Sequence, residues 1–254
     1  MMWRLVGASV VGTSHVANQI PCQDSNWATP GDPESPWPGL CMFASDGAGS
    51  ASHGGEGAEL AVETIATFLR NRGMNRGFVP TGSLFRECVI EVREKIRREA
   101  EAKGLTPRDF ACTLLGLIST ESNTAIMQIG DGGVVVDFGE GLKLPIIPMN
   151  GEYANSTYFV TDEDSLERLA THDVPARAVR AAVFTDGIQR LCVSMARNEP
   201  HEPFFRQMFS FLEASASMDQ DRLGDELVAF LNSDAVCERT DDDRTLLLAA
   251  EVPG

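Results

Sequence analysis

The sequence lacks the features of a membrane or secreted protein. No apolar run in its 254 residues approaches the roughly 18 residues that a membrane-spanning helix needs. Residues 1–6 lack the charged start, continuous apolar stretch and small-residue cleavage site of a signal peptide. The 6 cysteines lie far apart, so neither a zinc knuckle nor a redox motif is indicated. We therefore expect a soluble, cytoplasmic protein with reduced thiols and no membrane partner.

An excess of positive charge is also missing. The chain has 21 Lys and Arg against 37 Asp and Glu, a formal net charge of −16. Such a surface repels phosphate backbones, which argues against a nucleic-acid partner. An anionic substrate such as a phosphopeptide then requires bound cations that reverse the field locally. The length, with 43% hydrophobic and 23% charged residues, suits a single globular domain over 1–254.

The periodicity of the sequence predicts strands and helices of the α+β class. The strand-like segments are 3–12, 40–45, 111–120, 124–129, 134–138, 142–147, 158–161, 180–185 and 244–250. Helical spacing covers 55–72, 83–103, 164–170, 188–195, 203–213 and 221–231. Loops are predicted at 13–38, which is rich in proline, and at 148–157. A central meander with paired helices on each side argues against a doubly wound parallel sheet.

Two of the strands end in the same way. Residues 40–47 and 180–187 each carry an apolar strand into a hydroxyl residue, an aspartate and a glycine. The sheet fixes such an aspartate, and the glycine allows a sharp turn that brings a carbonyl oxygen close. Taken singly, an Asp-Gly pair is more often only a turn. Two such aspartates that converge would bind a divalent metal ion.

Six short motifs follow one another along the chain. They are CQDS at 22–25, ASDG at 44–47, ACTL at 111–114, IGDG at 129–132, FTDG at 184–187 and DDRT at 242–245. Their order and spacing resemble those of the metal-dependent protein phosphatases of type 2C, and most of all a bacterial branch with Cys-Gln-Asp and Ser-Asp-Gly-Ala-Gly-Ser. Because six weak motifs occur in the same order, they carry more weight together than any one of them alone.

The resemblance implies a fold and a metal centre. The fold is a four-layer αββα sandwich of two antiparallel sheets flanked by paired helices. At one end lies a centre of two Mn²⁺ or Mg²⁺ ions. Asp46 would bridge both ions, the Gly47 carbonyl would bind one, and Asp186 and Asp242 would bind the other. Asp46, Asp186 and Asp242 are thus the implied catalytic residues.

Further residues are implied around this centre. Asp24 would lie beside it, largely through water, and Asp131 matches a position that helps to hold a weaker third ion. Thr113 would orient a carboxylate or a water, although a β-branched residue is equally expected in a strand. Asp243 would close the last motif. An all-oxygen set of carboxylates repels itself unless protons or cations neutralise it, and it favours hard ions such as Mg²⁺ and Mn²⁺ over zinc.

The chain departs from the resemblance at three positions. Gln23 replaces a glutamate that many relatives carry, so we expect weaker metal binding and a preference for Mn²⁺ or millimolar metal. Gln19 replaces the arginine that grips phosphate. Ala48 stands where relatives have a proposed general-acid histidine. The candidate substitutes are His15 and His53, for which an ordinary loop role bonding to the backbone competes with catalysis.

Three hypotheses follow for the function. The first is a Mn/Mg-dependent protein phosphatase that hydrolyses phosphoserine and phosphothreonine and opposes a bacterial Ser/Thr kinase or acts on its target. The second is a weak or inactive phosphatase-like regulatory domain that binds a kinase or another partner. The third is a hydrolase of a small phosphorylated molecule. A polar flap within 139–173, including 150–155, is expected to set substrate choice.

Overall fold

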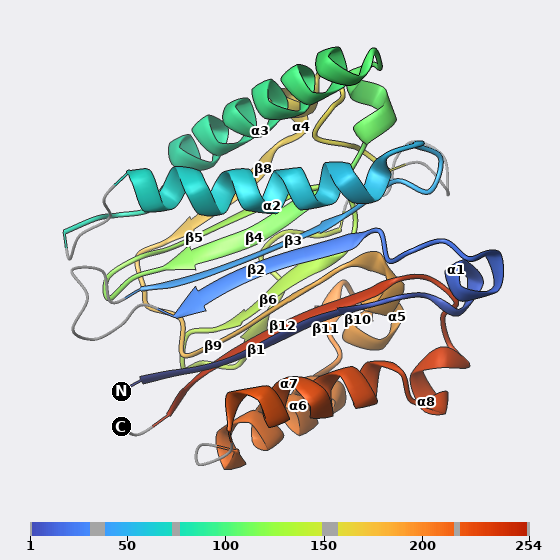
Figure 1. Ribbon diagram of the computed structural model, residues 1–254. Helices are drawn as coiled ribbons and strands as arrows, with labels where there is room; N and C mark the ends of the chain where they lie inside the picture. Colours follow the sequence, from blue (N-terminus) through green and yellow to red (C-terminus); the bar gives the residue numbers. More distant parts are fainter. Residues whose placement is uncertain (1, 31–38, 73–76, 149–156, 216–218, 253–254) are drawn as a thin grey trace.

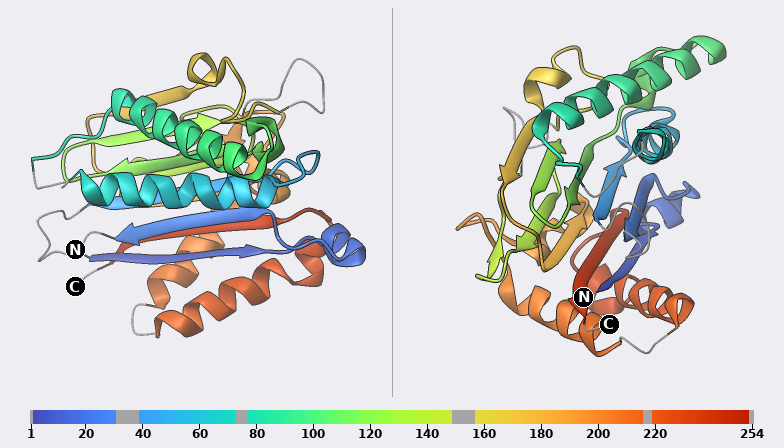
Figure 2. Two further views of the ribbon diagram at one scale, coloured as in Figure 1. Left: turned by 45° about the horizontal axis from the view of Figure 1, so that its top comes forward. Right: turned by 90° about the vertical axis from the view of Figure 1, so that its left-hand side faces the viewer.

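The computed structural model describes residues 2–30, 39–72, 77–148, 157–215 and 219–252. Two five-stranded antiparallel sheets lie face to face. Helices α2 (Gly54–Asn71) and α3 (Gly82–Lys103) cover one sheet, and α6 (Glu202–Ala214) and α7 (Gln220–Leu231) cover the other (Figures 1 and 2). The predicted four-layer α+β sandwich is confirmed.

Each sheet is built from strands that lie far apart in the sequence. The first has the order β1 (Met2–Val10), β12 (Arg244–Val252), β9 (Arg180–Phe184), β6 (Gly133–Asp137) and β7 (Leu142–Lys143). The second has the order β2 (Asp24–Pro30), β3 (Leu40–Asp46), β4 (Leu114–Ser119), β5 (Thr124–Ile129) and β8 (Ala170–Val174). β1 pairs with β12 along its whole length, so the two ends of the chain run side by side (Figure 1).

The side chains of β3 alternate between two buried faces, and this alternation positions the last residue of the strand. Cys41 and Phe43 pack into the core below α2 and α3. Met42 and Ala44 pack into the core between the sheets. Since successive side chains of a strand point to opposite faces, Asp46 continues the row of Met42 and Ala44. The carboxylate therefore lies on the inner side of the sandwich, at its open end.

The helices form because each has one apolar face to bury. In α2, the buried residues Ala58, Ala61, Val62, Ile65 and Leu69 recur at helical spacing. A residue in the left-handed conformation, Gly104 (φ 69°), ends α3. None of the helices within the described residues has both the length and the apolar composition to cross a membrane.

The predicted loop 13–38 is partly wrong. It contains α1 (Thr13–Asn18) and the strand β2, whereas residues 31–38 lie outside the described part of the chain. The start of β2 is polar because its inward-facing residues, Asp24 and Asn26, make hydrogen bonds between the sheets. Apolar periodicity therefore cannot detect this strand.

Four smaller predictions also need correction. Residues 158–161 form no strand, and the strand at 142–147 is limited to β7. The helix predicted at 164–170 is only α4 (Ser165–Arg168), after which the chain enters the unpredicted edge strand β8, whose central residues are exposed and polar. The helix at 188–195 consists of η2 (Asp186–Ile188) and α5 (Gln189–Cys192), followed by β10 (Val193–Ser194). The other unpredicted elements are η1 (Pro107–Phe110), β11 (Glu199–Pro200) and α8 (Asp234–Cys237).

Phe43 joins β3 to the helical layer and should dominate the stability of this half of the sandwich. It is 0% exposed, with ring centroids 6.2 Å from both Trp27 and Phe85. We predict that Phe43→Ala lowers the free energy of unfolding by about 3–5 kcal/mol, because it leaves a cavity. Phe211→Ala, at a partly exposed position of α6, should cost about 1 kcal/mol or less. Urea denaturation measures both, and similar losses would contradict this prediction.

Candidate metal centre

Carboxylates from both sheets gather at one end of the sandwich. Asp24, the first residue of β2, lies directly opposite Asp46, the last residue of β3, in the antiparallel register. From the other sheet, Asp186 follows the end of β9, and Asp242 precedes the start of β12. Residues that are more than two hundred positions apart in the sequence thus meet at one rim.

Asp24 connects the two sheets. One of its oxygens, Oδ2, accepts hydrogen bonds from the hydroxyls of Thr185 and Thr245, both at 2.7 Å. Within the described residues its other oxygen, Oδ1, is buried without a hydrogen-bond partner. Burial raises the pKa of Asp24 to about 6, against the opposing effect of the two hydroxyls. A buried carboxylate oxygen that lacks a donor is suited to bind a water or a cation.

The hydroxyls around Asp24 belong to a longer polar network between the sheets. Thr245 Oγ1 lies 2.7 Å from Ser9 Oγ, and the Asn26 side-chain amide donates to Ser9 Oγ at 2.8 Å. Ser9, Asn26 and Thr185 were not predicted from the sequence. Ser9 and Asn26 lie in the inward rows of β1 and β2, and Thr185 follows β9. Because a polar residue in an inward row needs a hydrogen-bond partner, these positions were the signal in the sequence that could have identified them.

The negative charge of the neighbouring carboxylates affects the pKa values of Asp46 and Asp186. Burial raises the pKa of Asp46 well above its ordinary value, and Asp24 and Asp186 raise it further. Burial also raises the pKa of Asp186 to about 7, with further increases from Asp131 and Asp242. Such mutual effects require the groups to be close together. At neutral pH, full ionisation of this cluster therefore requires nearby positive charge.

Backbone contacts fix Asp46 and the glycine that follows it. Asp46 N–H donates to Thr113 Oγ1 at 2.9 Å, and Thr113 N–H donates to the Asp46 carbonyl at 2.8 Å. Thr113 therefore holds the main chain of Asp46. A Cβ added to Gly47 would lie 2.3 Å from the main chain of Gly54. Only glycine fits there, and Gly47 lines the same pocket as Asp46.

Asp243 organises the loops under the rim. It is 2% exposed. Its carboxylate accepts the N–H groups of Gly12 at 2.6 Å and Gln23 at 2.5 Å, and its Oδ2 lies 2.9 Å from His15 Nδ1. Asp242, in contrast, is exposed and accepts the Asp243 N–H at 2.8 Å. Asp243 therefore bonds to the loops, whereas Asp242 lines the pocket.

Asp131 approaches from the turn between β5 and β6. Its Oδ2 accepts a hydrogen bond from the Thr157 hydroxyl at 2.7 Å. Burial is the main cause that raises its pKa above the ordinary value. Asp131 thus reaches the same cluster as Asp186, whose pKa it raises.

The rim borders one pocket of about 540 Å³, which the buried Asp24 and Asp243 do not line. Asp46, Asp131, Asp186 and Asp242 form its acidic walls, with His15 and Gln23 at the side. None of the described residues that line it is Lys or Arg. His53 does not line it: its ring lies 5.2 Å from that of Phe110, and its Nδ1 lies 3.0 Å from Ser52 Oγ. Of the two histidines, the structure therefore brings only His15 to the cluster.

The donor set fits hard divalent cations. Carboxylate and carbonyl oxygens are the ligands that Mg²⁺ and Mn²⁺ prefer. Within the described residues, no three His, Cys, Asp or Glu side chains form a ready metal site by themselves. An ion in this pocket therefore needs additional oxygens, from a carbonyl such as that of Gly47 or from water. The partnerless Oδ1 of Asp24 is placed to receive such a water.

A family profile described as protein phosphatase 2C matches residues 11–232. The chain is also 51% identical over 249 residues to Serine/threonine-protein phosphatase 3 of Escherichia coli (strain K12), covering 98% of both chains. The chain belongs to the protein phosphatase 2C family. Segments 22–25, 44–47, 129–132, 184–187 and 242–245, whose motifs resemble this family, each contribute at least one residue to the lining of the acidic pocket.

Solved structures of low sequence identity share the fold of this phosphatase 2C chain. PppA, described as a key regulatory component of T6SS in Pseudomonas aeruginosa, is 16% identical with a TM-score of 0.61, covering 98% of both chains. Stp1 of Staphylococcus aureus is 13% identical with a TM-score of 0.63, covering 100% of this chain and 96% of Stp1. The catalytic domain of PstP, solved in complex with 2 manganese ions, is 17% identical with a TM-score of 0.60, covering 99% of both.

The raised pKa values predict a stability that depends on pH in the absence of metal. Asp24 and Asp186 have pKa values of about 6 and about 7, above the ordinary 3.8. The stabilisation is therefore complete below about pH 4 and is lost as the pH rises through these folded-state values. We predict that in EDTA the Tm falls between about pH 4 and about pH 7, and that Mn²⁺ restores it.

Asn substitutions separate this effect from general charge repulsion. Asp186→Asn removes one of the clustered carboxylates, so the fall in Tm should become smaller. Asp225→Asn, an exposed position on α7, makes the same chemical change and should keep the slope of the original protein. Differential scanning fluorimetry provides the measurement. A Tm that is flat or rises over this range in EDTA would show that the carboxylates are not coupled.

Proposed function

We propose that this member of the protein phosphatase 2C family is a metal-dependent serine/threonine protein phosphatase, which releases phosphate from phosphoserine and phosphothreonine. One observation carries the proposal: Asp46 and Asp186, from two different sheets, share a pocket in which neighbouring carboxylates raise the pKa of both. The name of the E. coli relative supports the same activity and the same class of substrate.

The pocket would hold two divalent cations, Mn²⁺ or Mg²⁺. When bound, they supply acidity to an attacking water and positive charge for the phosphoryl oxygens. Asp46, the Gly47 carbonyl, Asp186 and Asp242 would hold these ions, and Asp46, Asp186 and Asp242 line the same pocket. The PstP catalytic domain, solved with 2 manganese ions, supports this number for a protein of the same fold.

Further groups adjust this centre. Asp24 would act through a water on its partnerless Oδ1, and its other oxygen joins the two sheets. Asp131, which lines the pocket, would help to hold a weaker third ion. Gln23 lines the pocket with a neutral amide, so its oxygen would contribute less charge to the site than a carboxylate and would lower the affinity for metal. We expect Mn²⁺ to support activity better than Mg²⁺ for this reason.

The substrate is a phosphorylated protein, and a Ser/Thr kinase that phosphorylates it acts in opposition. The open, acidic pocket lies at one end of the sandwich and is continuous with a larger groove. That space can receive an extended peptide as well as a phosphorylated side chain. The flap predicted at 139–173 contributes Thr157 and Phe159 to the pocket, whereas 150–155 lie outside the described residues.

Loss of a clustered carboxylate should abolish activity without unfolding the protein. We predict that Asp46→Asn and Asp186→Asn each lower kcat/KM for a phosphothreonine peptide in Mn²⁺ by more than about 100-fold, since several kcal/mol of charge stabilisation are lost. EDTA should abolish the activity of the original protein. Asp225→Asn is the matched control and should retain full activity. Phosphate release that persists in EDTA, or in both site variants, would refute the proposal.

His15 is placed to donate a proton to the leaving group. Its Nδ1 is held by the Asp243 carboxylate, so its other nitrogen, Nε2, is left for the pocket that His15 lines. A carboxylate on one side of the ring fixes its orientation. The alkoxide of serine or threonine needs a proton when it leaves, whereas an aryl oxide needs one far less.

Leaving-group dependence distinguishes this role from a structural one. We predict that His15→Asn lowers kcat for a phosphothreonine peptide by about 100-fold or more, with a much smaller effect on p-nitrophenyl phosphate. If His15 only holds Asp243 in place, both substrates should lose activity equally. His172→Asn, at an exposed position of β8, is the control and should change neither rate.

A regulatory domain without activity is the second candidate. It is favoured by Gln23 and by the absence of Lys and Arg among the described residues that line the pocket. Metal binding by calorimetry, with phosphate release at background for Mn²⁺, Mg²⁺ and several phosphopeptides, would establish this alternative. A small-molecule hydrolase would instead prefer phosphomonoesters in competition with phosphopeptides.

A further inference from the structure

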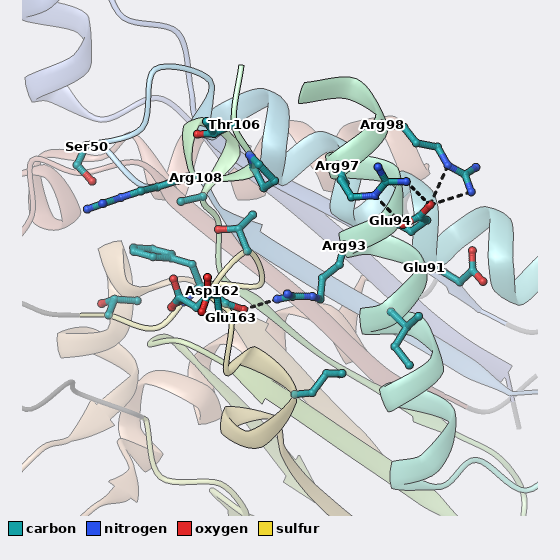
Figure 3. A pocket seen from close by; sticks show the side chains of 17 residues that line it. Ser50, Glu91, Arg93, Glu94, Arg97, Arg98, Thr106, Arg108, Asp162 and Glu163 are labelled. Carbon is teal, nitrogen blue, oxygen red and sulfur yellow. Dashed lines mark hydrogen bonds and ion pairs between the residues drawn. The ribbon is translucent and has the colours of Figure 1, made fainter. Parts of the chain in front are cut away.

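A groove of about 1140 Å³ (Figure 3) opens beside the acidic pocket of the candidate metal centre, which we call the acid pocket. The two spaces share Ser50, Thr157 and Phe159 among their lining residues. A peptide whose phosphorylated side chain enters the acid pocket can therefore continue into the groove. The acid pocket has no guanidinium or ammonium group among its described lining residues, whereas four arginines line the groove.

Three of the four arginines are bound to neighbouring groups. Arg93 donates to the carbonyls of Val160 and Asp162 and to the Ser165 hydroxyl, which fixes the opposite wall of the groove. Arg97 and Arg98 pair with Glu94 at 2.8 Å and 3.2 Å (Figure 3). The guanidinium groups of these three arginines are therefore already bonded to other groups of the protein.

Arg108 differs from the other three. It is exposed, and within the described part of the chain its guanidinium makes neither an ion pair nor a hydrogen bond. Figure 3 shows its side chain extended toward Ser50, one of the residues shared with the acid pocket. This cation thus lies at the junction of the two spaces.

The main chain under Arg108 is held firmly. Asp109 accepts the N–H and the hydroxyl of Thr106 at 2.9 and 2.8 Å, which closes the η1 turn. The Ser52 hydroxyl also donates to Asp109, at 3.0 Å, and Phe110 is 0% exposed. These bonds tie the turn that carries Arg108 to the loop that carries Ser50. The main chain that carries the guanidinium is therefore fixed, which lowers the entropic cost of binding a ligand.

We propose that Arg108 binds an acidic side chain of the substrate next to the phosphorylated residue, and so selects phosphopeptides with an Asp or Glu at that position. The proposal rests on the phosphatase activity proposed above and adds a substrate preference to it. A guanidinium binds a carboxylate with two parallel hydrogen bonds. The exposed Glu91 and Glu163 also line the groove, so the preference should be confined to one place near Arg108.

A set of phosphothreonine peptides tests the preference. Asp is placed at one flanking position at a time in an otherwise neutral peptide, and kcat/KM is measured in Mn²⁺. We expect one or two positions to raise kcat/KM about tenfold through KM, which is the effect of about 1.4 kcal/mol. Arg108→Ala should remove this gain, and Arg108→Glu should transfer it to Lys-flanked peptides. Hydrolysis of p-nitrophenyl phosphate should not change in either variant.

Arg98→Ala is the matched control, because it removes a guanidinium from the same groove that is already paired with Glu94. It should keep the preference for Asp. An Asp preference that survives in Arg108→Ala, or an original protein without preference at any position, would overturn the proposal.

A binding experiment keeps this proposal separate from the catalytic one. Fluorescence anisotropy with peptides that carry a non-hydrolysable phosphonate in place of phosphothreonine reports affinity without turnover. If the original protein prefers the Asp peptide and Arg108→Ala does not, Arg108 selects the ligand even when no phosphate release is found. Turnover without any such difference would leave the phosphatase intact and refute the role of Arg108.

Discussion

Mutual repulsion among buried carboxylates is the constraint to which the rest of the molecule is adapted. Asp24, Asp46 and Asp186 all have raised pKa values because burial and neighbouring charge act in the same direction. A chain that brings them together therefore needs another source of stability. That source is the paired sheets, whose apolar cores hold the strands that end at the cluster.

The polar network between the sheets explains how the ends are kept in register. Asp24 receives hydroxyls from the opposite sheet, while Asp243 binds main-chain N–H groups from the segments before α1 and β2. One carboxylate thus joins the layers and another joins the loops. Neither can be exchanged for an apolar residue without leaving buried donors unsatisfied. The proposed metal ligands rest on a frame that is itself made of polar contacts.

The sequence predicted the elements that have apolar periodicity and the aspartates at their ends. Asp46 and Asp186 could be placed because the strands before them are almost wholly apolar and glycine follows each. Strand β2 and the role of Ser9 could not, since polar residues in an inward row look like loop residues until their partners across the sandwich are known. Edge strand β8 was missed for another reason: its exposed Thr171, His172 and Asp173 resemble the end of a helix.

The charge of the chain gives this arrangement a functional consequence. A protein with a net charge of −16 and an acidic pocket repels phosphorylated ligands. Cations in the pocket reverse that field at short range, where screening by salt is weak. In the proposed site, the carboxylates that should destabilise the metal-free protein are therefore the same ones that would make phosphate binding depend on metal. Stability and substrate affinity should rise together as the pocket fills, because one electrostatic term controls both.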